Sequence, residues 1–214
     1  MTIQDDIFTA IVDGNSSAAD RLVAEALAAG ADAETLLQGT LVPAMAEVGA
    51  RFQAGEYFVS EMLVSAQAMK AGLKHLRPHL VSAETKPIGT VVIGTVKGDL
   101  HDVGKNLVGM MLEGAGFKVI DLGVDVAPAR FVGAVTESGA GLVALSALLT
   151  TTMLNMKAVV DALRANAATQ GVKVLIGGAP LSQEFADKIK ADGFAPDAAA
   201  AATRAKALIA PAAA

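Results

Sequence analysis

The stretch "IGTVVIGTVKGDLHDVGKN" at residues 88–106 decides the fold of the second half of the chain. Its apolar run, rich in β-branched residues, stops at the polar loop "KGDLHD", and a helical pattern resumes at Val103. A short apolar run of this kind is typical of a parallel strand that is buried on both faces. Ligands of open α/β sheets bind beyond the carboxyl ends of the strands. The sequence therefore predicts that His101, which lies in this loop, stands at a binding edge.

The same alternation of strand and helix continues to the C-terminus. Three further apolar runs, at 118–124, 141–148 and 172–178, and a weaker one at 193–196, predict strands. Helical patterns lie between and after them, at 103–116, 127–139, 151–169, 182–193 and 196–210. Regular alternation of this kind predicts a doubly wound, Rossmann-like (flavodoxin-like) parallel sheet of the α/β class. The last helix is rich in alanine and is expected to fray.

The first part of the chain reads instead as a four-helix module. Amphipathic patterns cover 3–14, 16–30, 32–56 and 57–80. Ser16 is a candidate N-cap of the second helix, and Pro43 is expected to kink or split the third. In the fourth helix the spacing predicts one shared face for four residues, Phe58, Met62, Ser65 and Met69. We expect a helical bundle at 1–81, a linker at 82–87 and an α/β domain at 88–214.

The composition narrows the range of functions. The net charge is −5, which argues against a protein that binds the phosphate backbone of nucleic acids. Cysteine is absent, so disulfides, thiolate nucleophiles and cysteine-ligated iron–sulfur clusters are excluded. No apolar run approaches the roughly 20 residues of a transmembrane helix, and "MTIQDDIF" does not resemble a signal peptide. We expect a cytoplasmic protein with neither a nucleic-acid nor a membrane partner.

Three interpretations of His101 are open. It is a surface residue, a general base oriented by Asp99, or a metal ligand whose second ring nitrogen donates to Asp99. A zinc site needs three or four protein ligands, and this half of the chain holds no second His and no Cys. His75 and His79 are interrupted by Pro78 and do not form an HExxH motif. A single histidine suffices for a metal that brings its own equatorial ligands, which points to a macrocycle.

The spacing of three motifs resembles a known family. Asp99 to Gly104 match D-x-H-x-x-G, Ser146 to Leu148 match S-x-L after 41 intervening residues, and a Gly-Gly pair, Gly177 and Gly178, follows after 28 more. This series resembles the domain that takes up cobalamin base-off, with a protein histidine on cobalt. The helical segment at 39–69 resembles the cap module of methionine synthase and of small corrinoid proteins. Those small proteins serve methyltransferase systems for methanol, methylamines, glycine betaine or methoxylated aromatics.

The resemblance implies a role for each matching residue. His101 would be the axial cobalt ligand, Asp99 would accept from its other nitrogen, and Thr152 would complete a proton-linked triad in which methionine synthase has serine. The other implied cofactor contacts fall in three groups. Asp102 and Val103 lie beside His101. The pocket for the displaced benzimidazole tail would be lined by Ser146, Leu148 and Thr150, and the nucleotide tail would come close to the backbone at Gly104, Gly177 and Gly178. The upper corrin face would be covered by Phe58 and Met62, with Met69 further along. Without the resemblance these residues are ordinary loop, turn and core positions.

The implied activity is methyl carriage. Cobalamin, as cob(I)alamin, methylcobalamin and hydroxocobalamin, would take a methyl group from a substrate-specific methyltransferase and give it to an acceptor methyltransferase that uses tetrahydrofolate or a thiol. A reductive activation protein would be a third partner, and the chain would be a non-autonomous subunit. A storage or sensing protein is the alternative, because storage needs the same pocket. A DNA-binding regulator would carry a segment ahead of the bundle, and the small subunit of an adenosylcobalamin mutase resembles the second half alone.

Overall fold

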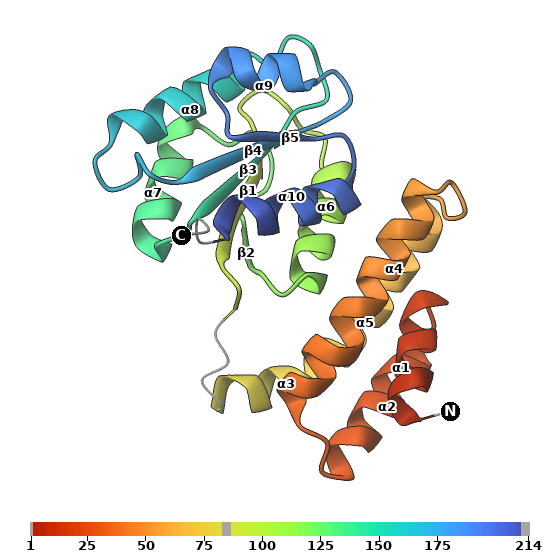
Figure 1. The fold of residues 1–214 in the computed structure, drawn as a ribbon. Helices are drawn as coiled ribbons and strands as arrows, with labels where there is room; N and C mark the ends of the chain where they lie inside the picture. Colours follow the sequence, from red (N-terminus) through yellow and green to blue (C-terminus); the bar gives the residue numbers. More distant parts are fainter. Residues whose placement is uncertain (1, 83–86, 211–214) are drawn as a thin grey trace. The chain divides into compact units, whose positions relative to one another are not determined.

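The structure is a computed structural model that describes residues 2–82 and 87–210 (Figure 1). The chain divides into two compact units, and the main division falls between residues 86 and 87. Of the linker predicted at 82–87, residues 83–86 lie outside the described part of the chain, so the exact extent of the linker stays a prediction.

The first unit is the predicted helical module. Its helical elements are α1 (Ile3–Val12), α2 (Ser16–Ala28), α3 (Ala33–Leu36), the π-helical turn η1 (Leu37–Leu41), α4 (Val42–Gln53) and α5 (Val59–Ser82). The N-cap of α2 is Asn15, whose side chain accepts from the Ala18 amide, so the expectation that Ser16 caps this helix is wrong. Ser16 is the first helical residue instead, and both residue types serve well as caps.

The third predicted helix is split, as Pro43 suggested. The wide π turn η1 ends at Leu41, and α4 begins one residue before Pro43. Proline has no N–H to donate and its ring crowds the carbonyl four residues earlier, so a change of helix type just ahead of it relieves both problems.

The predicted shared face of the fourth helix holds for three of its four residues. Met62, Ser65 and Met69 are buried in α5. The Ser65 hydroxyl donates to the carbonyl of Val12 at 2.8 Å, which ties α5 to the end of α1. Phe58, however, precedes α5 and is 69% exposed, so its predicted place on that face is wrong. Its backbone N–H donates to the Glu61 carboxylate at the start of the helix, which turns the chain at this point.

The second unit is the predicted doubly wound sheet. Its strands are β1 (Thr90–Thr95), β2 (Lys118–Asp121), β3 (Leu142–Ser146), β4 (Lys173–Gly177) and β5 (Gly193–Ala195). Its helices are α6 (Val103–Gly114), α7 (Pro128–Ser138), α8 (Asn155–Ala165), α9 (Gln183–Ile189) and α10 (Ala198–Ile209). All pairings are parallel in the order β2-β1-β3-β4-β5, which is the flavodoxin-like order.

The register aligns the carboxyl ends of the strands. Thr95 pairs with Ser146, and Ser146 pairs with Gly177, so β1, β3 and β4 end side by side. The three loops that the sequence singled out therefore leave the sheet along one edge. The order of strands reverses between β1 and β3, where open α/β sheets place their ligands.

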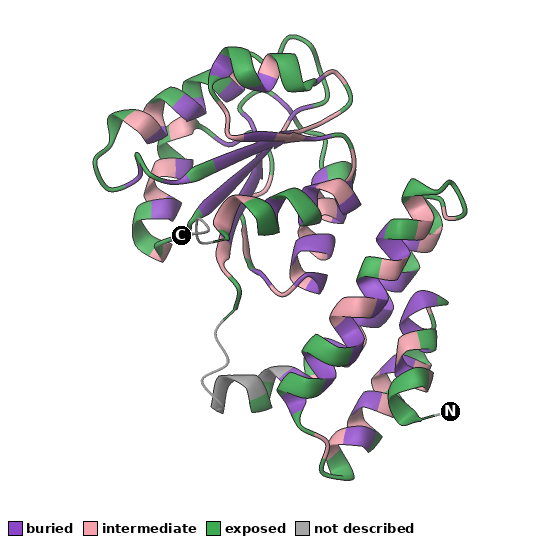
Figure 2. Cartoon of the chain, viewed as in Figure 1, coloured by how far each residue is buried: buried purple, intermediate pink, exposed green. Residues whose placement is uncertain are grey.

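Helices cover both faces of the sheet. α7, α8 and α9 pack on one face through an apolar core that contains Phe131, Met156 and Ile189. The connection through α6 runs in the opposite direction along the sheet, and right-handed crossovers then place α6 on the other face. The strands between the layers are largely buried, as Figure 2 shows in purple.

The alanine-rich helix α10 is part of this packing. Its alanines at 198, 199, 201, 202 and 205 are buried, and it lies against β3, β4 and β5. Asp197 caps it by accepting from the Ala200 amide. The expectation of a fraying helix is therefore wrong for residues 198–209; alanine is used here because its small side chain lets the helix approach the sheet closely.

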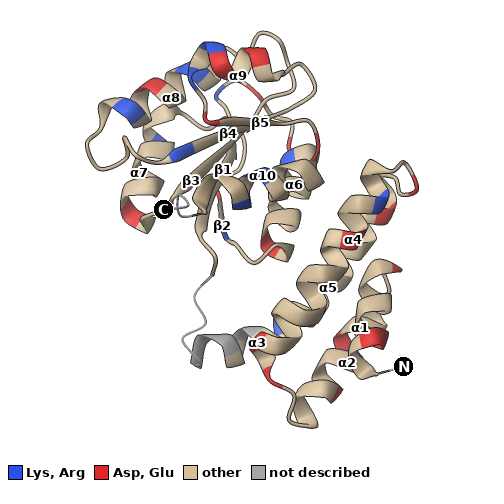
Figure 3. Cartoon of the chain, in the orientation of Figure 1, with Lys and Arg blue, Asp and Glu red and all other residues tan. Residues whose placement is uncertain are grey.

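Lysine and arginine residues (blue) and aspartate and glutamate residues (red) occur together along α8 and α9 in Figure 3. Lys157 pairs with Asp161 one turn later in α8, and Arg164 pairs with Asp192. Among the described residues, none of the helices combines the length and the apolar character needed to cross a bilayer.

A pair of alanines in α10 tests its packing. Ala205 is fully buried and Ala207 is exposed. We expect Ala205→Leu to lower the free energy of unfolding by about 1–3 kcal/mol through overpacking, and Ala207→Leu to change it by less than about 0.5 kcal/mol. Urea unfolding of both variants measures this, and equal effects would show that α10 does not pack on the sheet.

Candidate functional site

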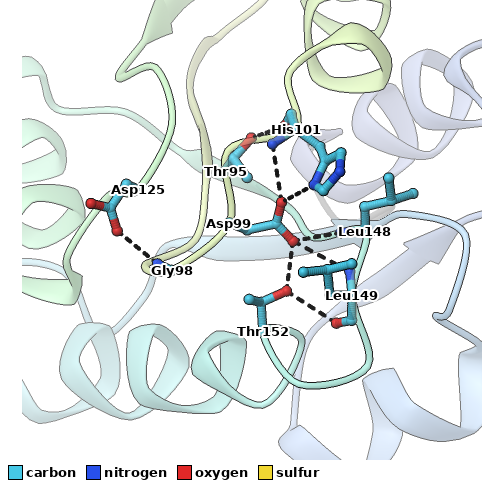
Figure 4. A network of polar contacts seen from close by, with 8 residues as sticks. All are labelled: Thr95, Gly98, Asp99, His101, Asp125, Leu148, Leu149 and Thr152. Carbon is cyan, nitrogen blue, oxygen red and sulfur yellow. Dashed lines mark hydrogen bonds and ion pairs between the residues drawn. The ribbon is translucent and has the colours of Figure 1, made fainter.

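The site is built around the carboxylate of Asp99, which is completely buried just after β1. Its Oδ1 accepts from His101 Nδ1 at 2.7 Å and from the His101 amide at 3.1 Å. Its Oδ2 accepts from the Thr152 hydroxyl at 2.6 Å and from the amides of Leu148 and Leu149 at 2.8 and 3.3 Å (Figure 4). Two loops of the sheet thus meet on one carboxylate.

These hydrogen bonds decide the charge of Asp99. Burial acts to raise the pKa of this carboxyl group, but the bonds from Thr152, Leu148 and His101 outweigh it and hold the pKa far below the usual value for aspartate. Asp99 is therefore ionised at neutral pH, and an ionised carboxylate only accepts hydrogen bonds.

The charge of Asp99 in turn determines which ring nitrogen of His101 carries the proton in the neutral ring. Because Asp99 only accepts, His101 Nδ1 must carry a proton and donate it. In the neutral ring the lone pair then lies on Nε2. The His101 side chain is 51% exposed, and within the described part of the chain no hydrogen bond is made to Nε2. When the ring is neutral, the site therefore presents Nε2 as a single, oriented imidazole nitrogen with a free lone pair.

The loop that carries both residues is folded tightly. Gly98 has a φ of +84°, which favours glycine, and the Asp99 amide closes a turn onto the Val96 carbonyl at 3.1 Å. The buried Thr95 hydroxyl donates to the His101 carbonyl at 2.8 Å. His101 is thus held through its ring, its amide and its carbonyl.

The loop between β3 and α8 supplies the donors on the other side of Asp99. The sequence predicted a helix from residue 151, but α8 begins at Asn155 and residues 149–154 form turns. The predicted start was wrong because the amides of Leu148 and Leu149 and the Thr152 hydroxyl all donate to Asp99 Oδ2, and the chain turns around this oxygen before the helix begins. Thr152 lies in this turn and not in a helix. Asn155 also donates to the Lys97 carbonyl at 2.7 Å.

The three predicted glycines, Gly104, Gly177 and Gly178, differ in whether the fold has room for a side chain at their position. Gly178 has a φ of +140°, and a Cβ there would overlap the carbonyl oxygen of Ala147, so the close approach of two loops of the sheet already demands glycine. A Cβ on Gly177 would lie 3.3 Å from the Ala195 carbonyl oxygen. A Cβ on Gly104, by contrast, would have no neighbour within 4 Å. Gly104 therefore leaves open space beside His101.

The other predicted contacts of this unit lie along the same edge. Ser146 ends β3 and is partly buried, while Thr150 and Asp102 are exposed. Val103 and Leu148 are exposed large apolar side chains, and further exposed apolar side chains on these loops belong to Leu100, Val124, Leu149 and Leu154. An apolar rim around a polar centre is typical of a cofactor site.

Phe58 and Met62 belong to the first unit. Phe58 is exposed, whereas Met62 is fully buried. Their predicted role as a cover of the cofactor stays a prediction.

Several residues that support the site were missed by sequence reasoning. The amides of Leu148 and Leu149 and the Thr95 hydroxyl belong to this group, together with Asn155 and Asp125, whose carboxylate accepts from the Gly98 amide at 2.7 Å. Backbone amides are present at nearly every residue, so the sequence does not indicate which of them donate to Asp99. The one available signal was Asp99 itself, since a buried carboxylate requires several donors.

Comparison with known proteins places both units in one family. Two family models, each described as a B12 binding domain, match residues 89–203 and residues 3–77. The trimethylamine corrinoid protein of Methanosarcina barkeri is 42% identical over 202 residues, which cover 94% of this chain and 93% of that protein.

Two solved structures are similar over nearly the whole chain. A cobalamin-binding protein from Desulfitobacterium hafniense matches with a TM-score of 0.80 at 32% identity, covering 97% of this chain and 98% of the other. The methanol:cobalamin methyltransferase complex of Methanosarcina barkeri contains a chain that matches with a TM-score of 0.84 at 32% identity, covering 97% of this chain and 80% of that chain.

Replacing Thr152 tests the network around Asp99. We expect Thr152→Val, which keeps the shape and loses the hydroxyl, to lower the free energy of unfolding by about 1.5–3 kcal/mol at neutral pH, the usual contribution of a hydrogen bond to a charged group. Thr152→Ser keeps the hydroxyl and should cost about 1 kcal/mol or less for the lost methyl group.

The pH dependence of this difference has a definite sign. The pKa of Asp99 is lower in the folded protein than in the unfolded chain. Its hydrogen bonds therefore stabilise the fold fully above about pH 4, and this stabilisation is lost as the pH falls through the folded pKa. Urea unfolding at several pH values should show the deficit of Thr152→Val shrinking in acid. A deficit that is equal in the Val and Ser variants, or that grows in acid, would contradict the network.

Proposed function

The chain belongs to the family of B12-binding corrinoid proteins, with cobalamin as its cofactor, and from this premise we propose that it carries a methyl group between two methyltransferases. The first would be specific for the methyl donor, and the second would pass the group to an acceptor such as tetrahydrofolate or a thiol. A protein that reduces the cofactor after accidental oxidation would complete the system. The chain would then be one subunit of a methyltransferase system and not a complete enzyme.

The residues of the second unit fit a corrinoid. His101 offers one oriented nitrogen, which suits a metal whose equatorial ligands come from a macrocycle. The open space at Gly104 and the exposed apolar side chains of Leu100 and Leu148 suit a large, mainly apolar ring with a nucleotide tail. The close approach at Gly178 is consistent with a tail bound along the strand ends, although the fold alone already requires that glycine.

Cobalamin supplies a cobalt ion that accepts and releases a methyl group. In our proposal His101 Nε2 would coordinate the cobalt, and Asp99 would keep the ring in the tautomer that this coordination needs. The Thr152 hydroxyl and the Leu148 amide keep Asp99 ionised, so Asp99 accepts from Nδ1 and leaves Nε2 for the metal.

The observation that carries this proposal is the position of Asp99, with one oxygen on His101 Nδ1 and the other on Thr152 Oγ1. An oriented histidine of this kind suits cobalt ligation in a carrier and in a storage protein alike. The similarity to the trimethylamine corrinoid protein favours the carrier. The solved relative named as a methyltransferase complex supports a methyltransferase partner.

Electron paramagnetic resonance of the protein loaded with Co(II) cobalamin tests the ligand. In protein made with ¹⁵N-histidine, the nitrogen splitting of the cobalt signal should change from triplet to doublet, because the coordinated nitrogen belongs to the protein and not to the benzimidazole. His101→Ala should lose the ¹⁵N doublet, and His79→Ala, at an exposed histidine, should keep it. A triplet in the labelled parent protein would rule out His101 as the ligand.

Methyl carriage is tested with the same reduced, loaded protein. It is incubated with an extract of cells that express it naturally and with isotope-labelled methanol, methylamines or glycine betaine. We expect label from one donor class on the protein-bound cofactor of the parent protein, and at least about tenfold less on that of His101→Ala, the loss expected for one strong polar contact. A protein that binds cobalamin tightly but acquires label from no donor would instead be a storage or sensing protein.

A further inference from the structure

Asp125, in the loop between β2 and α7, has an unusual backbone. Its φ is +53°, and Lys190 is the only other non-glycine residue with a positive φ among residues 2–82 and 87–210. The left-handed region is unfavourable for residues with a Cβ, although aspartate tolerates it better than most. Such a conformation persists only where the surrounding structure imposes it.

The surroundings of Asp125 explain its conformation. Its Oδ1 accepts from the Gly98 amide at 2.7 Å, and its own amide donates to the Asp99 carbonyl at 3.0 Å (Figure 4). One residue therefore binds both ends of a dipeptide in the loop after β1. The positive φ lets the amide and the side chain of Asp125 face the same neighbouring strand end.

This pair of bonds continues the pairing of the two strands. Beyond the end of β2, the Thr95 amide donates to the Gly123 carbonyl and the Val126 amide donates to the Thr95 carbonyl, at 3.0 Å each. Asp125 lies in sequence between Gly123 and Val126, and it bonds further along the loop after β1, to the Gly98 amide and the Asp99 carbonyl. The loop that carries His101 is thus attached to the β2 side of the sheet by a continuous set of hydrogen bonds.

The other known contacts of the loop cannot replace Asp125. Thr152, Leu148 and Leu149 hold the side chain of Asp99, not its backbone. Within the described part of the chain, the Gly98 amide and the Asp99 carbonyl bond to Asp125 alone. These two groups belong to the peptides on either side of the Gly98–Asp99 peptide, whose own N–H donates to the Val96 carbonyl. Loss of the Asp125 bonds would free the two outer peptides to rotate, and such a rotation would turn the Asp99 carboxylate away from His101.

We propose that Asp125 is a positioning residue for His101. It fixes the Lys97–Gly98 and Asp99–Leu100 peptides, these peptides fix the direction of the Asp99 carboxylate, and the carboxylate fixes the His101 ring. The inference rests on the proposed role of His101 as axial ligand. It adds a residue from a third loop of the sheet, which lies outside the D-x-H-x-x-G motif and does not itself need to contact the cofactor.

Three variants separate the side chain of Asp125 from its backbone. Asp125→Gly keeps the positive φ without strain and removes the acceptor. Asp125→Asn tolerates the same φ and keeps an oxygen at Oδ1. Lys190→Gly is the control: it also replaces a residue of positive φ with glycine, but at the C-cap of α9, away from the site. All three are made in the full-length protein.

The first measurement is amide hydrogen exchange of the cofactor-free protein. We expect residues 98–101 to exchange about five- to tenfold faster in Asp125→Gly, the loss of about one net hydrogen bond, and at the parental rate in Asp125→Asn and Lys190→Gly. The second is the ¹⁵N-histidine doublet of the Co(II) form. Its fraction should fall in Asp125→Gly and be restored in Asp125→Asn.

Each possible result of these measurements either supports or contradicts the role of Asp125. The inference is overturned if Asp125→Gly matches the parent protein in either measurement, if Asp125→Asn behaves like Asp125→Gly, or if Lys190→Gly changes the doublet as well. Absence of the doublet in the parent protein would instead refute the proposed function, and hydrogen exchange would still report whether Asp125 holds the loop.

Discussion

The constraint on which the site depends is the burial of one ionised carboxylate, that of Asp99. An ionised carboxylate removed from water is costly unless its oxygens are fully hydrogen-bonded. Asp99 meets this requirement with two donors from His101 and with three from the loop after β3. Removing any donor leaves the charge less compensated, so the two loops and the histidine are stabilised together.

The rest of the second unit serves this arrangement. The parallel register ends β1 and β3 at the same level, which brings the two loops within reach of each other. Gly178 lets the loop after β4 approach the backbone of Ala147, directly beside the donors at Leu148 and Leu149. The small side chains of α10 allow a helix to cover β3, β4 and β5 closely. The sheet thus keeps the polar centre around Asp99 in place.

Much of this could be predicted from the sequence, because periodicity and motif spacing are local properties. The strands, their order of appearance and the pairing of Asp99 with His101 follow patterns readable along the chain, whereas the contact of Asp99 with Thr152 was implied by the resemblance to the cobalamin-binding family. What failed depends on tertiary contacts. The late start of α8, the exposure of Phe58 and the packing of α10 are set by neighbours distant in sequence. Asp125 could not be found, since its role comes from a backbone angle and from bonds to another loop.

The central claim is that Asp99 fixes the tautomer of His101 before any cofactor binds. Nitrogen NMR of ¹⁵N-histidine-labelled, cofactor-free protein tests it most directly, at about pH 9, where imidazoles are ordinarily neutral. The account predicts that His101 carries its proton on Nδ1 and a bare lone pair on Nε2, and that Asp99→Ala yields a mixture of both tautomers. A His101 ring protonated mainly on Nε2 in the parent protein would contradict it.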